Sequence, residues 1–98
     1  MNTQTQTIVH ATDVTGQRSA RLTVPPQSLM GTVIAQAIGL MDLPTESASR
    51  EREPIIYHCY EDGAGELLPP ETSVEEIIRQ YRIEAELRVR VVPELEAA

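Results

Sequence analysis

The feature that most constrains the fold is a strand pattern near the N-terminus that stops at two prolines. Apolar and polar side chains alternate over residues 18–24, as in a strand with one buried and one exposed face. Pro25 and Pro26 end this strand, because proline has no N–H to donate to a sheet. Residues 7–12 are rich in β-branched side chains, and a turn sequence at 13–17 joins the two strands. The chain therefore begins with a β-hairpin, one face of which must be covered.

A helix that can cover this face is predicted directly after the prolines. Ser28 is a candidate N-cap, and apolar residues then recur three and four positions apart. They are Met30, Val33, Ile34, Ala37, Ile38 and Met41. This stripe predicts an amphipathic helix packed on the sheet, which ends near Gly39 and closes with Leu43 and Pro44.

The middle of the chain predicts a second, shorter hairpin. A polar loop over 45–53 leads to a predicted strand over 55–60. Gly63 and Gly65 mark a turn, and residues 67–68 form a short return strand before two further prolines.

The C-terminal third predicts a short helix and a last strand. Ser73 followed three residues later by Glu76 fits a capping box, which predicts a helix over 74–81. Apolar residues then alternate with arginines over 87–92, as expected for a strand.

Together these elements predict an α+β domain with a mixed sheet of four to five strands, one main helix on one face and a short second helix. The first and last strands are expected to lie parallel in the sheet centre, which explains the valine-rich last strand. The sequence has no Trp or Phe, so aliphatic side chains with Tyr57 or Tyr60 must fill the core. We expect a disordered N-terminal lead over 1–6, a domain over 7–92 and a flexible C-terminal tail over 93–98.

Composition narrows the class of partner. Ninety-eight residues suffice for one domain with one modest core. A net charge of −7 argues against nucleic acid and anionic membranes, and favours proteins with basic surfaces. The sequence shows no signal sequence and no apolar run that could span a bilayer. Its single cysteine excludes an internal disulfide. We therefore expect a cytoplasmic protein that is not inserted in a membrane.

Catalysis finds little support in the sequence. His10, His58 and Cys59 are the candidates for nucleophilic or metal chemistry. Adjacent residues of a strand point to opposite faces, so His58 and Cys59 are not expected to act together. The sequence has no phosphate-binding glycine loop and no cluster with the spacing of metal ligands. It predicts a protein that is not an enzyme, with no catalytic residue, no metal and no cofactor.

Two parts of the chain resemble ubiquitin-like proteins. The second strand, the main helix and its Leu-Pro closure resemble the corresponding parts of ubiquitin, and the segment around the second helix is similar to that of bacterial YukD-like proteins. The matching positions are residues 22–28, Leu43, Pro44, residues 67–74, Ile83, Leu87 and Val89. The resemblance extends over 7–92 and implies a ubiquitin-like β-grasp fold.

This resemblance implies a bacterial protein modifier. Such a modifier is activated at its C-terminus by an E1-like enzyme, transferred by an E2-like enzyme to target proteins, and in some systems removed by a deconjugating protease. The tail that would carry the linkage comprises Glu94, Leu95, Glu96, Ala97 and Ala98. Conjugated family members and sulfur carriers generally end in Gly-Gly, so the tail sequence disfavours sulfur carriage. The alternative is a non-covalent adaptor, for example one that binds a component of a type VII secretion machine.

A candidate interaction face follows from strand alternation. If Tyr57 and Cys59 point to the helix, the residues between them point outward, next to the arginines of the last strand. The candidate residues are Ile56, His58, Tyr60, Arg88 and Arg90. Tyr and Arg are enriched at the energetic centres of protein interfaces. The alternative is that the two arginines only solvate one face of a strand.

Overall fold

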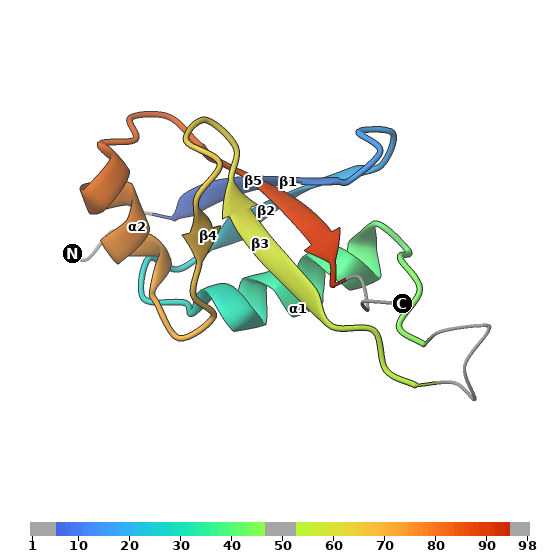
Figure 1. Cartoon of the computed structure of the whole chain (residues 1–98). Helices are drawn as coiled ribbons and strands as arrows, with labels where there is room; N and C mark the ends of the chain where they lie inside the picture. Colours follow the sequence, from blue (N-terminus) through green and yellow to red (C-terminus); the bar gives the residue numbers. More distant parts are fainter. Residues whose placement is uncertain (1–5, 47–52, 95–98) are drawn as a thin grey trace.

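The five strands form one mixed sheet, and α1 lies across one of its faces (Figure 1). The computed structural model describes residues 6–46 and 53–94. In chain order the elements are β1 (Thr7–Asp13), β2 (Ser19–Val24), α1 (Met30–Leu40), β3 (Tyr57–Glu61), β4 (Leu67–Leu68), α2 (Val74–Tyr81) and β5 (Leu87–Pro93). The strand order across the sheet is β2-β1-β5-β3-β4.

The first and last strands lie side by side in the sheet, as the sequence predicted. β1 pairs with β2 in antiparallel fashion and with β5 in parallel fashion. Val9 faces Leu22 on one side and Leu87 on the other, and all three side chains are buried. The central strands therefore present a continuous apolar surface to α1.

The apolar stripe of α1 packs on this surface. Its predicted residues are buried, except for Ile38, which is partly buried against the same core. Leu68, Val74 and Ile77 extend the core toward α2. Tyr57 also packs against the core, so one of the two candidate tyrosines contributes to it. Small aliphatic side chains thus fill the interior of a chain that lacks Trp and Phe.

The start of α1 differs from the prediction. The N-cap is Leu29 rather than Ser28, and no side chain caps the helix. Instead, the amide of Met30 donates to the carbonyl oxygen of Thr72 at 2.9 Å, and the next amide donates to that of Pro70 at the same distance. The loop before α2 therefore supplies the acceptors that a capping side chain would have supplied.

The other element boundaries follow the prediction closely. α2 begins as expected, with the Ser73 hydroxyl accepting from the Glu76 amide at 3.3 Å. The predicted strand at 55–60 begins two residues later, because β5 pairs with this segment only from Tyr57 onward. The amide of Ile55 donates instead to Thr45 in the loop after α1.

Arg18 ties the β1–β2 turn to the end of α1. Its Nη1 donates to the carbonyl oxygens of Asp42 at 2.7 Å and Met41 at 3.2 Å, and Asp42 has a left-handed φ of 56°. We expect Arg18→Met to lower the free energy of unfolding by about 1 kcal/mol, because the last carbonyls of a helix favour a nearby cation. Urea denaturation measures this loss. Gln17→Met, at the neighbouring exposed position, is the control, and an equal loss in both variants would contradict the role of Arg18.

Candidate interaction surface

The sheet face opposite α1 is the candidate site, and we call it the outer face. On β3 and β5 the side chains alternate between the two faces as strand geometry requires. Cys59 pairs with Val91 and both are buried under α1, whereas the next pair, Tyr60 and Arg90, points outward. The structure thus brings His58 and Tyr60 of β3 to the same face as Arg88 and Arg90 of β5.

Strand register aligns the outward side chains in rows across the sheet. One row crosses all five strands and consists of Ser19, Thr12, Arg90, Tyr60 and Leu67. A second row consists of Arg21, His10 and Arg88. Tyr60 therefore lies between the cationic side chain of Arg90 and the apolar side chain of Leu67. Leu67 is 51% exposed, so it contributes apolar surface to the outer face. Directly opposed side chains of neighbouring strands lie close enough to act as one surface.

Carboxylates balance the arginines of this face. Glu86, whose side chain is only 14% exposed, lies between Arg21 at 2.8 Å and Arg88 at 3.5 Å. Arg90 lies 3.6 Å from the carboxylate of Asp62. Each outward arginine therefore has an acidic neighbour from an adjoining loop, and the charge of the outer face is mixed.

Two of the predicted site residues, Ile56 and His58, are hydrogen-bonded to Glu94, the residue that follows β5. Ile56 lies just before β3, is 57% exposed, and accepts a backbone hydrogen bond from Glu94 at 2.7 Å. His58 Nε2 lies 2.7 Å from Glu94 Oε1. Glu94, predicted as the first carboxylate of a flexible tail, is thus bound to β3. The other predicted tail residues, Leu95, Glu96, Ala97 and Ala98, lie outside the described residues.

Sequence reasoning missed several members of the outer face. They are His10, Thr12, Arg21, Asp62, Leu67 and Glu86. The alternation of residues 18–24 already placed Arg21 on the exposed side, so this residue could have been found. Asp62 and Glu86 lie in loops, where no periodicity indicates the direction of a side chain.

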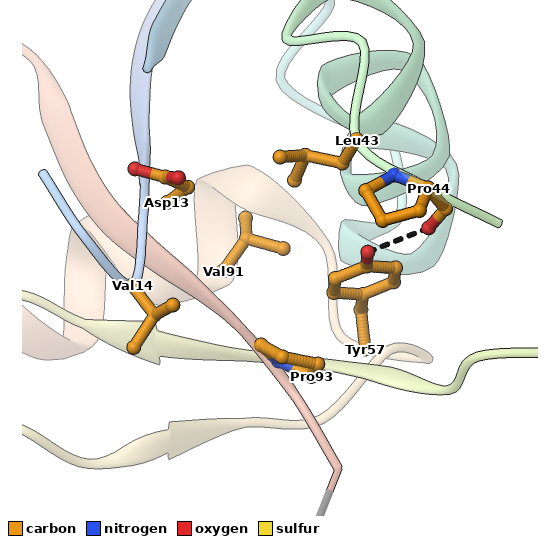
Figure 2. Close-up of a pocket in the computed structure, with 7 residues that line it drawn as sticks. All are labelled: Asp13, Val14, Leu43, Pro44, Tyr57, Val91 and Pro93. Carbon is orange, nitrogen blue, oxygen red and sulfur yellow. Dashed lines mark hydrogen bonds between the residues drawn. The ribbon is translucent and has the colours of Figure 1, made fainter. Parts of the chain in front are cut away.

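An apolar pocket of about 190 Å³ lies at the end of the sheet where β5 finishes (Figure 2). Its lining residues are Asp13, Val14, Leu43, Pro44, Tyr57, Val91 and Pro93. The Tyr57 hydroxyl donates to the Pro44 carbonyl oxygen at 2.6 Å, which fixes the tyrosine ring along one wall. Burial raises the pKa of Tyr57, so this hydroxyl keeps its proton.

Asp13 supplies the charged group of this pocket, and local donors satisfy it. Burial raises its pKa, but hydrogen bonds from the Arg18 amide, the Thr15 hydroxyl and nearby turn amides outweigh burial and leave the pKa below its usual value. The Thr15 hydroxyl lies 2.9 and 3.0 Å from the two carboxylate oxygens. Asp13 therefore serves to hold the β1–β2 turn.

The described residues offer little for catalysis. Cys59 is 1% exposed, and burial raises the pKa of its thiol to about 12, so it is not a nucleophile in the folded chain. Within residues 6–46 and 53–94, no three His, Cys, Asp or Glu side chains gather as a metal site would require.

Neither α1 nor α2 has the length and apolar character needed to cross a bilayer.

Comparison with known proteins identifies the fold. The sequence matches no protein-family profile and none of the curated proteins. Among solved structures, ubiquitin of Caldiarchaeum subterraneum is similar, with a TM-score of 0.64, 12% identity, and coverage of 96% of this chain and 100% of that chain. ATG8 of Trypanosoma brucei also has a TM-score of 0.64, with 15% identity over 95% of this chain and 77% of that chain.

A third similar structure comes from work entitled "Molecular Mimicry of SUMO promotes DNA repair". It has a TM-score of 0.61 and 15% identity, and the match covers 93% of this chain and 95% of that chain. At identities of 12–15%, these three matches show that the fold is shared and show nothing about the function of this chain. The five-stranded mixed sheet with two helices is a ubiquitin-like β-grasp fold, as the sequence predicted.

Proposed function

We propose that this chain is a ubiquitin-like protein that binds other proteins through its outer face, as a non-covalent adaptor and not as an enzyme. The observation that carries the proposal is the row in which Tyr60 lies between Arg90 and Leu67. An aromatic ring flanked by a cation and an exposed aliphatic side chain has the composition of an interface centre.

Charge balance defines the kind of partner. The chain as a whole carries −7, but the outward arginines of the outer face have Glu86 and Asp62 as neighbours. A partner on this face therefore needs apolar contacts for Tyr60 and Leu67, together with polar groups of both signs. A component of a type VII secretion machine in the bacterial cytoplasm is one partner that the sequence resemblance suggests.

Reversing the charge of two outward arginines tests this proposal. We expect Arg88→Glu combined with Arg90→Glu to weaken partner binding by at least about tenfold, because each variant carboxylate would face Glu86 or Asp62. The partner is first recovered by affinity capture with the tagged chain, and its Kd is then measured by titration against each variant.

Two exposed arginines on the α2 side supply a matched control. Arg79→Glu combined with Arg82→Glu changes the net charge by the same amount away from the outer face. The control is expected to bind like the unchanged chain. Equal weakening in both double variants would reject the outer face as the binding surface.

A second candidate function is covalent modification of targets through the C-terminal tail. It is favoured by the position of β5, the last strand of the described residues, which leads the chain out of the sheet at exposed Glu94. The steps would be activation by an E1-like enzyme with ATP, transfer by an E2-like enzyme, and removal by a deconjugating protease. The chain contains no lysine, so it offers no side-chain amine for self-conjugation.

Mass spectrometry separates the two candidates. Incubation with an active E1-like enzyme and ATP is expected to give an acyl adduct through the tail if the chain is a modifier. An adaptor gives no adduct, and its partner binding survives deletion of residues 95–98, which leaves Glu94 beside His58 in place. Loss of partner binding on that deletion, with Arg88→Glu and Arg90→Glu without effect, would overturn the adaptor proposal.

A further inference from the structure

We propose that the groove between β4 and α2 is a binding site for an arginine side chain of a partner protein. The inference deepens the proposed adaptor role, and it rests on that role for the statement that the occupant belongs to a protein. Three features of the groove carry it: an apolar lining with fixed walls, two carboxylates without a cation, and continuity with the outer face.

The groove lies at the edge of the sheet, where α2 lies beside β4 (Figure 1), and has a volume of about 450 Å³. Leu68 of β4 and Ile77 of α2 both line it, and both are anchored in the hydrophobic core. Its two walls are therefore fixed before any partner binds. Leu67 and Pro69 add exposed apolar surface on the β4 side, which suits the methylene groups of a long side chain.

Two carboxylates line the groove, those of Glu66 next to β4 and Glu76 in the first turn of α2. Among residues 6–46 and 53–94, no arginine or histidine forms an ion pair with either of them, whereas the carboxylates beside the outer face are already paired. Arg79 of α2 and Arg82 just after it do not line the groove. Its negative charge is therefore open to a cation from another molecule.

Tyr81 holds one of these carboxylates in place. Its hydroxyl donates to Glu66 Oε1 at 2.6 Å. This hydrogen bond is the main cause that raises the pKa of Tyr81 to about 12, so the hydroxyl keeps its proton at neutral pH. A carboxylate has two oxygens and accepts several hydrogen bonds, so Glu66 retains the capacity to accept from a ligand. Because the side chain is already positioned, less conformational freedom is lost on binding.

Arginine fits this combination of groups better than lysine does. A guanidinium is planar, donates two hydrogen bonds to one carboxylate, and stacks on an aromatic ring such as that of Tyr81. Its methylene groups would lie on the apolar lining supplied by Leu67 and Ile77. A lysine ammonium ion is a strongly hydrated point charge and lacks this planar face.

Leu67 joins the groove to the outer face. It lines the groove and also ends the row that contains Arg90 and Tyr60. β4 is the edge strand, and the Glu66 carbonyl oxygen accepts from the Glu61 amide at 2.8 Å. Antiparallel pairing alternates, so the backbone amide and carbonyl of Leu67 point to the open edge. A partner segment that contacts Tyr60 can therefore continue over Leu67 and place an arginine in the groove.

NMR titration of the isolated full chain tests the site. The probe is acetyl-leucyl-arginine amide, and its control carries citrulline, which has nearly the shape of arginine but no charge. We expect the arginine probe to give saturable shifts of the Leu67, Leu68 and Ile77 methyl signals, with a Kd on the order of 1–10 mM. The citrulline probe should give no saturable shift there. A lysine probe should bind about threefold more weakly than the arginine probe.

Neutral variants of the two carboxylates show whether charge holds the probe. Glu66→Gln combined with Glu76→Gln should weaken the arginine probe by at least about threefold, because both charges are lost while side-chain size is kept. Glu71→Gln combined with Glu75→Gln is the matched control. It changes the net charge equally at exposed positions that do not line the groove, and Glu75 shares the first turn of α2 with Glu76. The control should bind the probe like the unchanged chain.

The proposal is overturned if the citrulline probe binds equally well, if both double variants weaken binding equally, or if the arginine probe gives no saturable shift in the groove. Equal affinity for the lysine probe would overturn the choice of arginine. With the captured partner, Glu66→Gln combined with Glu76→Gln should again raise the Kd by at least about threefold; an unchanged Kd would reject a partner arginine in the groove. The peptide titration leaves Arg88 and Arg90 unchanged, so its failure is distinguishable from failure of the outer face as a binding surface.

Discussion

Replacing Leu87 by alanine is expected to lower the free energy of unfolding by about 2–4 kcal/mol, through lost apolar burial and the cavity left behind. Leu87 is fully buried at the start of β5, beside Val9 of β1. The loss is large for this chain because its core contains no Phe or Trp that could move into the cavity. Urea denaturation followed by circular dichroism measures it.

Arg88→Ala provides the control for this prediction. Arg88 is the next residue of β5, but its side chain is 67% exposed on the outer face. Arg88→Ala is expected to lower the free energy of unfolding by less than about 1 kcal/mol. If the two variants unfold at the same urea concentration, the inward and outward positions of β5 have been assigned wrongly.

The thiol of Cys59 is expected to react with a disulfide reagent at pH 8 at least about 10³ times more slowly in the folded chain than in urea. The thiolate is the reactive species, and burial raises the pKa of Cys59 to about 12, so the thiolate is scarce at this pH. The side chain is also 1% exposed, between Leu68 of β4 and Val91 of β5. The rate at which the reagent releases its coloured product measures the reaction rate of Cys59 in the folded chain and in urea.

Moving the thiol by one residue tests the same geometry from the opposite side. A chain with Cys59→Ala and His58→Cys carries its thiol on the outer face, where His58 is 38% exposed. This thiol is expected to react at a rate close to that of the unfolded chain. Rapid labelling of the native Cys59 would contradict its burial and with it the alternation of β3.

The most predictable elements were those whose signals lie within a few residues of one another. The capping of α2 by Ser73 depends on an amide three residues away, and the apolar stripe of α1 depends on helical spacing alone. Strand alternation likewise predicted that Tyr60 and Arg90 point away from α1 on the condition that Cys59 points toward it, and Cys59 is buried. The parallel pairing of β1 and β5 came from recognition of the overall pattern, since neither strand determines its neighbour by itself.

The candidate site was predictable only in part, because its charges come from different segments. Glu86 joins Arg21 of β2 to Arg88 of β5, and 65 residues separate Arg21 from Glu86 in the chain. The pairing of Arg90 with Asp62 depends on the β3–β4 turn folding over β5. No local pattern reports such contacts, so the sequence indicated the tyrosine and the arginines of the outer face but not the carboxylates beside them.

The sequence by itself determined the type of each element, the inward faces of β2 and β5 and the apolar side of α1, because spacing and local hydrogen bonding set these; the inward face of β3, with apolar residues on both faces, was left as a condition. Tertiary structure decided the rest. It capped α1 with the carbonyl oxygens of Thr72 and Pro70, placed carboxylates beside the outer arginines, and formed the pocket from the β1–β2 turn, the loop after α1, β3 and β5. The physical reason is that these features arise between groups distant in the chain, whose proximity exists only after the sheet has formed.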